Sequence, residues 1–390
     1  MSDKSIVGNL NYPTDYRIGT GNVRTLPAVC AELGIYRPLI VTDKNIPRLD
    51  WFQTVVRDLD GTALKTRVFS DIDPNPSSDH VAAGIAAFTD HRADGCVVVG
   101  GGSAMDTGKC IVLLVDNPGT VFDYEDDNDN WKRADSDLIA PCIAIPTTAG
   151  TGSEVGRAAV ILDPLDKTKK IIFHPHMAPD LVLADPQLTV GLPSDLTAGT
   201  GMDAFAHCFE AYCVESYHPM ADGIALEGMR LIAENLVVAF DHGGNIEART
   251  HLLMAAAMGA TAFQKGLGLI HALSHPLGGV TGCHHGTVNA IFQPYVMINN
   301  RKVIEHKMSQ LAGYLNLPAD HFDDVLNWVL ELRKRLQIPH TLTGILDAEM
   351  IPELVAKTTA DPSLATNPKH CNTEDIERVL RAALDGNLTY

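Results

Sequence analysis

The sequence predicts a two-part protein, with a doubly wound parallel α/β sheet in the first half and only helices in the second. Two observations predict it. Over residues 37–186, short β-branched runs that end in turn residues alternate with helix-like stretches, the pattern of a parallel sheet covered on both faces. Beyond about residue 190 the extended runs nearly vanish and helical periodicity takes over. We therefore predict two domains, 1–190 and 191–390.

Each expected element rests on its own local pattern. Five runs look like strands that end in turn chemistry: 37–43, 65–71, 94–102, 141–148 and 180–186. Between them, helix-like periodicity covers 78–91 and 103–115. In the second half it covers 195–216, 219–240, 247–263, 301–315, 320–337, 348–358 and 373–385.

Composition excludes several classes of function. The formal net charge is −18 and no Lys/Arg run exists, so a nucleic-acid partner is disfavoured. No uninterrupted apolar run approaches the length of a membrane span. The eight cysteines are scattered without a C-x-x-C pair, and residues 1–13 lack an apolar leader. We expect a soluble cytoplasmic protein with reduced thiols.

Two loops predict a site for a dinucleotide. In "VVVGGGSAMDTGK" (97–109), three glycines follow a strand and precede a helix, with Ser103 as the expected N-cap. Such a turn lets a phosphate approach the helix N-terminus, although a plain strand-to-helix turn is the alternative. "PTTAGTGSEV" (146–155) adds hydroxyls and glycines after another strand, and Asp43 ends "LIVTD". A carboxylate there can bind an adenosine ribose and repel a 2′-phosphate, which favours NAD over NADP; a simple turn Asp is the alternative.

Histidines and one carboxylate predict a metal site in the second half. In "GMDAFAHCFEAY" (201–212), Asp203 and His207 lie four residues apart and share a helix face. "HALSHPLGGVTGCHHG" (271–286) repeats this spacing and then adds two adjacent histidines. Imidazoles with one carboxylate suit Fe²⁺ or Zn²⁺, whereas a hydrogen-bonded pair is the alternative. Spacing leaves open two choices: His271 or His275, and His284 or His285.

These four motifs, in this order and at these separations, resemble the iron-containing (group III) alcohol dehydrogenases over essentially the whole chain. The resemblance implies a Rossmann-like NAD-binding domain followed by an all-helical metal-binding domain, a dehydroquinate synthase-like architecture. It implies Asp203, His207, His271 and His285 as the metal ligands, and His275 as a non-ligand beside nicotinamide and substrate. It also implies a set of cofactor-binding residues: Asp43, Gly100, Gly101, Gly102, Ser103, Asp106, Thr147, Thr148, Thr151 and Lys169.

The expected activity is metal-dependent, NAD(H)-linked interconversion of a short-chain primary alcohol and its aldehyde, with His275 as the candidate proton relay. If Arg157 or Lys265 faces the substrate, either cation could pair with the far carboxylate of an ω-hydroxy acid of the 4-hydroxybutyrate type or its semialdehyde. Surface cations are the alternative. Three rivals are a lyase of the dehydroquinate synthase type, a maleylacetate reductase and a non-catalytic scaffold; the complete, cysteine-free ligand set disfavours them. Resemblance and size predict a homodimer or larger homo-oligomer.

Overall fold

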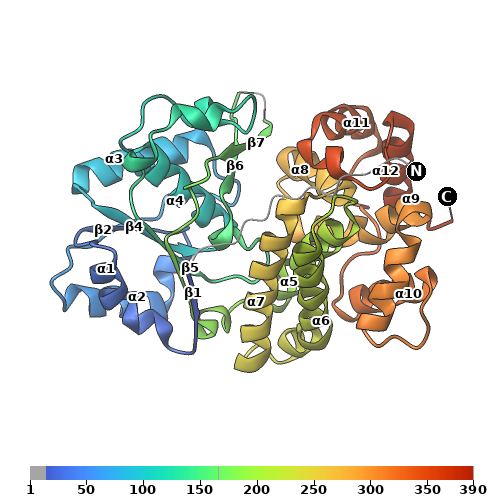
Figure 1. Ribbon diagram of the computed structural model, residues 1–390, viewed down its shortest axis with the longest axis horizontal. Coiled ribbons are helices and arrows are strands. Elements are labelled where there is room, and N and C mark those ends of the chain that lie inside the picture. The colour runs from blue at the N-terminus through green and yellow to red at the C-terminus, as the bar shows by residue number, and fades with distance from the viewer. Residues whose placement is uncertain (1–14, 166, 390) are drawn as a thin grey trace. The chain divides into compact units, whose positions relative to one another are not determined.

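The computed structural model describes residues 15–165 and 167–389. The chain divides into two compact units after Gly191. Strands occur in the first unit, whereas the second contains helices and loops in its described part (Figure 1). The predicted fold class is therefore confirmed. Residues 1–13, on which the expectation of a missing leader rests, lie outside the described residues.

Within the described part of the first unit, six parallel strands form a sheet in the order β1-β8-β5-β4-β2-β3. Each of the five predicted strands is present, and β1 is an addition at one edge, paired with β8. Their bounds are β1 (Asp15–Ile18), β2 (Pro38–Val41), β3 (Arg67–Phe69), β4 (Gly95–Gly100), β5 (Cys142–Pro146) and β8 (Leu181–Ala184).

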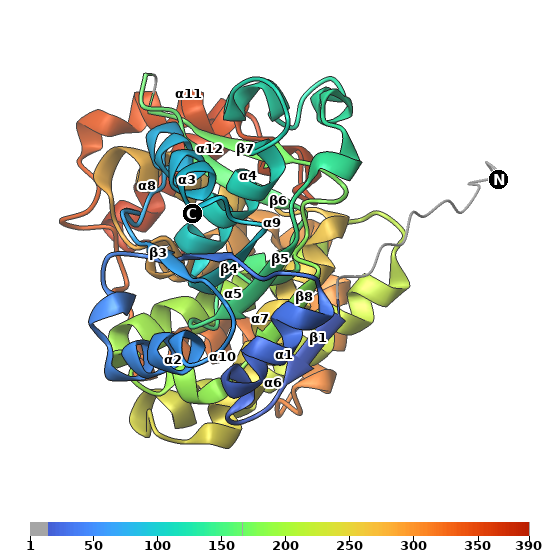
Figure 2. The same ribbon diagram turned by 90° about the vertical axis from the view of Figure 1, so that its left-hand side faces the viewer.

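Helices cover both faces of this sheet (Figure 2). Val97 and Val99 of β4 belong to the core shared with α1 (Leu26–Glu32) and α2 (Asp50–Asp60). Val98 points the other way, against Gly108 of α4 (Gly102–Leu114), which packs with α3 (Ser78–His91). The alternation follows from the two-residue period of a strand. An antiparallel hairpin of β6 (Ala158–Leu162) and β7 (Lys169–Phe173), which we did not predict, lies outside the sheet.

The second unit is built around α5, whose residues 201–213 are all buried and which packs against α6, α7 and α9. Two features differ from prediction. α8 was not predicted because Pro276 and two glycines interrupt its pattern, and α9 begins at His285 rather than near residue 301. The helices are α5 (Ser194–Cys213), α6 (Pro219–Asp241), α7 (Ile246–Ala262), α8 (Leu269–Thr281), α9 (His285–Tyr314), α10 (Phe322–Arg335), α11 (Ile351–Ala360) and α12 (Thr373–Asp385).

Two further observations concern cysteines and membranes. The eight cysteines are all free thiols, and every one except Cys283 is buried. Across residues 15–165 and 167–389, no single helix has both the length and the hydropathy needed to cross a membrane. One pair bent by 108°, Ile246–Lys265 with Leu269–Thr281, passes by length and composition only when taken together.

Candidate functional site

The glycine-rich turn joins the end of β4 to the start of α4. Gly100 has a φ of 155°, and a Cβ on it would lie 2.7 Å from the Cβ of Ala104, so a side chain does not fit there. The N-cap is Gly101, and the helix already begins at Gly102. Our prediction of Ser103 as the N-cap is therefore wrong, because the glycines complete the turn earlier and Ser103 lies in the first helical turn. The first N–H groups of this helix are available to an anionic ligand.

The loop that follows β5 packs directly against this turn. A Cβ on Gly101 would lie 3.0 Å from Thr148 Oγ1, and one on Gly102 would lie 2.8 Å from Thr151 Oγ1. Thr147 donates its backbone N–H to the carbonyl of the last residue of β4 at 3.0 Å. The structure thus brings the predicted glycines and threonines together at the carboxyl ends of two neighbouring strands, where parallel α/β sheets bind nucleotides.

Asp43 lies beside the same turn, because β2 pairs with β4. Its Oδ1 accepts hydrogen bonds from the N–H groups of Asn45 at 2.7 Å and Ile46 at 3.3 Å. Its Oδ2 lies 3.8 Å from the position of a Cβ on Gly100. One oxygen therefore holds the local turn, and the other is placed where a carboxylate can accept a hydrogen bond from a ribose and repel a 2′-phosphate.

Asp106 of α4 is buried, and its carboxylate joins this helix to the loop after β5 and to β6. Its Oδ1 accepts a hydrogen bond from Ser153 Oγ at 2.5 Å, and its Oδ2 accepts one from the N–H of Val160 at 2.9 Å. The buried Lys109 ammonium donates to the Ser153 carbonyl at 2.9 Å. Both carboxylate oxygens thus have a partner within the first unit, and the predicted contact of Asp106 with a cofactor stays a prediction. Lys169 lies at the first position of β7, in the hairpin rather than the sheet.

Glu154, in the loop after β5, is the basis of a prediction about pH. The residue is 3% exposed, and burial raises the pKa of its carboxyl to about 7, despite the opposing effects of a hydrogen bond to its own backbone and of the Lys109 charge. In the unfolded chain this group titrates near ~4.3. Because the pKa is higher in the folded state, the contribution of Glu154 to stability is fully present below the unfolded pKa of ~4.3. It is lost as the pH rises from there through the native pKa of about 7. The full loss corresponds to ~3 kcal/mol.

We therefore expect Glu154→Gln to become more stable relative to the parent protein as the pH rises. The variant has no charge to bury, so the difference in free energy of unfolding should grow by up to ~3 kcal/mol between about pH 4 and pH 8. Urea unfolding of the parent protein and the variant across this pH range measures this difference in free energy of unfolding. A difference that does not change with pH would show that the Glu154 carboxyl is not destabilised by burial.

Four predicted metal-binding residues come together in the helical unit. Asp203 and His207 lie on α5, His271 on α8 and His285 on α9. The Nε2 atoms of the three histidines lie 4.0, 3.9 and 3.7 Å, in chain order, from Asp203 Oδ1. For the first three residues, one ligand atom each lies within 4.8 Å of all the others. Ligand atoms around one tetrahedral ion lie roughly 3.4 Å apart, so Asp203, His207 and His271 fit Fe²⁺ or Zn²⁺ with a slight contraction. His285 is placed beside this group by its 3.7 Å distance to Asp203 Oδ1.

The structure places the neighbouring histidines elsewhere. His284 caps α9, with its Nδ1 accepting from the N–H of Thr287 at 3.3 Å and 3.0 Å from that residue's Oγ1. His275 Nδ1 lies 2.9 Å from Asp361 Oδ2, and its ring stacks on that of His285 at 5.4 Å between centroids. The two choices that spacing left open are thus resolved in favour of His271 and His285 as the residues beside Asp203.

Glu210 is part of this site, although the sequence analysis missed it. Its Oε2 lies 2.6 Å from His271 Nδ1, and its Oε1 accepts the N–H of Ile270 at 2.6 Å. The pKa of His271 is raised: burial would lower it, but the Glu210 and Asp203 carboxylates outweigh that effect. With the Nδ1 proton held by Glu210, the Nε2 lone pair of His271 would be left to hold a metal ion. The available signal was spacing, since Glu210 follows Asp203 by seven residues on one helix face.

Two other residues were missed. Asn289 follows His285 by four residues, and its Nδ2 lies 2.8 Å from Asp203 Oδ1, so helical spacing could have found it. Asp361 is 86 residues from His275, its partner, and no local pattern connects them. Burial alone would raise the pKa of Asp361, but the His275 imidazole holds it below its usual range.

The two cations considered for a substrate carboxylate have different surroundings. Lys265 is buried, and its Nζ lies 2.5 Å from Asp222 Oδ1, so this ammonium is neutralised inside the helical unit. The structure does not support the hypothesis for Lys265. Arg157 lies half-buried before β6, with its guanidinium 5.8 Å from the centroid of the Phe173 ring. Among the described residues, it forms no ion pair with a carboxylate.

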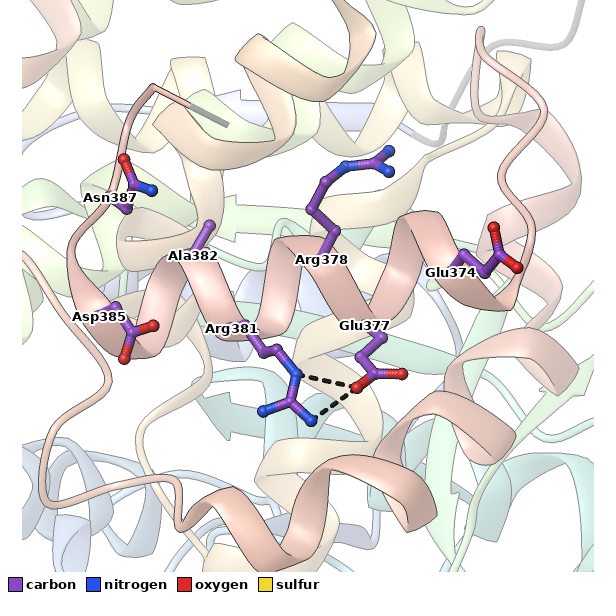
Figure 3. A pocket seen from close by; sticks show the side chains of 7 residues that line it. All are labelled: Glu374, Glu377, Arg378, Arg381, Ala382, Asp385 and Asn387. Atoms are coloured by element: carbon purple, nitrogen blue, oxygen red, sulfur yellow. Dashed lines mark hydrogen bonds and ion pairs between the residues drawn. The ribbon is translucent and has the colours of Figure 1, made fainter.

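A surface pocket of about 340 Å³ runs along α12 and contains none of the predicted site residues (Figure 3). It is lined by side chains of both charges: Glu374, Glu377, Arg378, Arg381, Ala382, Asp385 and Asn387. Arg381 is already paired with Glu377 at 2.6 Å. Because neither charge dominates, the lining matches no single class of ligand, and this pocket is not the candidate site.

Comparison with known proteins decides the family. Residues 13–186 match the model of the iron-containing alcohol dehydrogenases, and residues 197–384 match the model of that family's C-terminal domain. The chain belongs to the iron-containing alcohol dehydrogenase family. It is therefore an NAD-linked, iron-type alcohol dehydrogenase, as the sequence predicted.

Individual members of this family cover nearly the whole chain. The 4-hydroxybutyrate dehydrogenase of Cupriavidus necator is 37% identical over 384 residues, 96% of this chain and 99% of that protein. The NAD-dependent methanol dehydrogenase of Bacillus methanolicus is 32% identical, over 96% of this chain and 100% of that protein. The crystal structure of a 1,3-propanediol oxidoreductase matches with a TM-score of 0.89 at 29% identity, covering 97% of this chain and all of that one.

Proposed function

We propose that this alcohol dehydrogenase interconverts a short-chain primary alcohol and its aldehyde, with NAD as the cofactor and a divalent ion held by Asp203, His207, His271 and His285. The observation that supports it most is the convergence of three imidazole Nε2 atoms within 4.0 Å of one carboxylate oxygen. Asp203, His207 and His271 are buried, and burying such polar groups is costly unless they bind a cation or form hydrogen bonds.

When bound, the ion would supply Lewis-acid chemistry to the alcohol or aldehyde oxygen, and NAD would supply the hydride chemistry. The residues of the chain have separate tasks. Glu210 holds His271 in the tautomer that presents Nε2. His275 is oriented by Asp361 through Nδ1, which leaves its Nε2 to exchange the hydroxyl proton. The glycine turn and Thr148 and Thr151 bind the phosphates of the cofactor.

The reaction is tested with iron-loaded protein and a set of alcohols and aldehydes of equal length. We expect NADH oxidation with butanal and NAD⁺ reduction with 1-butanol, and far less activity with NADPH because Asp43 repels the 2′-phosphate. Absence of turnover with any short aldehyde, in protein shown to contain iron, would contradict the proposal.

A second candidate is the oxidation of an ω-hydroxy acid of the 4-hydroxybutyrate type. It is supported by the 37% identical 4-hydroxybutyrate dehydrogenase and by the guanidinium of Arg157, which forms no ion pair with a carboxylate in the described part of the chain. A guanidinium without an internal carboxylate can form a charge-assisted, bidentate hydrogen bond with the carboxylate of a substrate.

Arg157→Met tests this candidate. A hydrogen bond to a charged group is worth ~1.5–3 kcal/mol, so we expect the KM for succinate semialdehyde to rise at least roughly tenfold, with that for butanal unchanged. Lys170→Met is the matched control, because Lys170 is a cation of the same hairpin already paired with Asp163 at 2.8 Å. Equal effects of Arg157→Met on both aldehydes would exclude carboxylate recognition by this residue.

We also propose that the protein is cytoplasmic, forms a homodimer or larger homo-oligomer, and has no nucleic-acid or membrane partner. Eight free thiols support a reducing compartment. A net charge of −18 disfavours binding to phosphate backbones. Light scattering coupled to gel filtration measures the molar mass of the protein in solution and so the number of subunits.

A further inference from the structure

Helix α9 carries a row of polar side chains at four-residue spacing: the partly exposed His285, followed by the buried Asn289 and Gln293. Residues at this spacing share one face of a helix. Asn289 and Gln293 are both 0% exposed. A buried carboxamide is costly unless it is hydrogen-bonded, so each of these amides requires an explanation.

The carboxamide of Asn289 lies against three of the candidate metal ligands. Its Nδ2 is 2.8 Å from Asp203 Oδ1, 3.2 Å from His271 Nε2 and 3.1 Å from His285 Nε2. An amide nitrogen has two hydrogens and cannot serve three acceptors. Imidazole nitrogens that bind a metal have no lone pair left, whereas a carboxylate oxygen keeps one. The bond that persists with a metal in place is therefore the one to Asp203, which is also the shortest.

The same nitrogen covers one face of the donor set. Asp203 Oδ1 lies 3.9 Å from His271 Nε2 and 3.7 Å from His285 Nε2, so these three atoms define a triangle. A nitrogen within 3.2 Å of each corner lies over that triangle and occupies the space a water molecule would need.

We propose that Asn289 is a positioning residue of the metal site: it holds Asp203 Oδ1 by a hydrogen bond and keeps solvent from coordinating through this face. The inference rests on the proposed ligand set. It implies that the coordination position used by the alcohol lies away from Asn289, because the carboxamide already fills that side.

Gln293 provides a matched control. It lies one turn further along the same helix, is equally buried, and neither of its amide atoms has a hydrogen-bond partner among residues 15–165 and 167–389. Gln293→Leu removes an unsatisfied amide and is expected to be neutral or stabilising. It therefore reports the effect of replacing a buried amide on α9 without touching a ligand.

The test uses Co²⁺-loaded full-length protein and two variants, Asn289→Leu, which keeps the volume but removes the donor, and Asn289→Ala, which removes both. Chelator competition gives the Kd for Co²⁺. The visible d–d absorption reports coordination number, since its intensity falls as ligands are added. Circular dichroism confirms that the variants are folded.

We expect the Kd to rise roughly tenfold or more in both variants, as is typical for lost outer-shell partners. The absorption should weaken only in Asn289→Ala, where water can enter, and Gln293→Leu should match the parent in both measurements. If Asn289→Leu binds Co²⁺ as tightly as Gln293→Leu does, or Asn289→Ala leaves the absorption unchanged, the inference is overturned. Failure of the parent protein to bind Co²⁺ would instead overturn the proposed ligand set.

Discussion

Removal of the metal with a chelator is expected to lower kcat/KM for aldehyde reduction by ~10³-fold or more, and Fe²⁺ added under anaerobic conditions is expected to restore it. Lewis-acid stabilisation of a developing alkoxide is worth several kcal/mol, and ~4 kcal/mol corresponds to a factor of 10³. None of the described residues at the candidate metal site supplies a positive charge that could stabilise the alkoxide in place of the metal. Asp203 and Glu210 are both acidic, and the Nδ1 proton of His271 is donated to Glu210.

The control for this experiment is cofactor binding. The glycine turn and the threonine loop belong to the first unit, whereas the candidate ligands all belong to the second. Quenching of protein fluorescence by NADH should therefore give the same Kd before and after chelation. Full activity in protein shown by elemental analysis to be free of metal would contradict the assignment. Zn²⁺ in place of Fe²⁺ gives a second comparison, because it binds at least as tightly to sites of this kind.

Replacement of Glu210 by leucine is expected to weaken metal binding by up to ~100-fold. The carboxylate has two partners, and both are lost: His271 Nδ1 and the N–H of Ile270. Without Glu210, the imidazole is free to place its proton on Nε2, which removes the lone pair that the metal needs. The unsatisfied Ile270 N–H adds a cost of ~1–3 kcal/mol to folding.

The conservative variant separates charge from hydrogen bonding. Glu210→Gln keeps one acceptor oxygen but removes the negative charge, so we expect an intermediate loss of ~10-fold in Fe²⁺ affinity. Isothermal titration or chelator competition measures the Fe²⁺ affinity of the parent protein and of both variants. Thermal unfolding measures how far each substitution lowers the melting temperature. If the leucine variant binds Fe²⁺ as the parent does while its melting temperature falls, Glu210 supports the fold but does not orient the ligand.

Much of the fold follows from local patterns. The runs 37–43, 94–102 and 141–148 become β2, β4 and β5 because β-branched residues favour a buried strand and each run ends in turn chemistry. Residues 78–91 form α3 with the predicted bounds. The errors arise where local signals conflict with packing: α8 contains Pro276 and glycines, and only burial against α9 and α11 makes it a helix.

The features of the candidate site that were predicted depend on nearby residues, and those that were missed depend on residues far apart in the sequence. The pairing of Asp203 with His207, the glycine turn and Asp43 at a strand end were all predicted, because each depends on residues close in sequence. Lys265 was considered for the substrate because no local feature showed that Asp222, 43 residues away, neutralises it. Asp361 was missed for the same reason.

The sequence by itself thus determined the class of fold, the dinucleotide loops and the residue types of a metal site, since the periods of helix and strand act over a few residues. Spacing left open which histidines converge; the family resemblance implied His271 and His285, and only the tertiary structure gives the physical reason for that choice. His271 and His275 share one helix face, but packing of α8 directs the first to Glu210 and Asp203 and the second to Asp361. His285 reaches Asp203 while His284 caps its own helix. Such choices depend on contacts between distant segments, which no local spacing encodes.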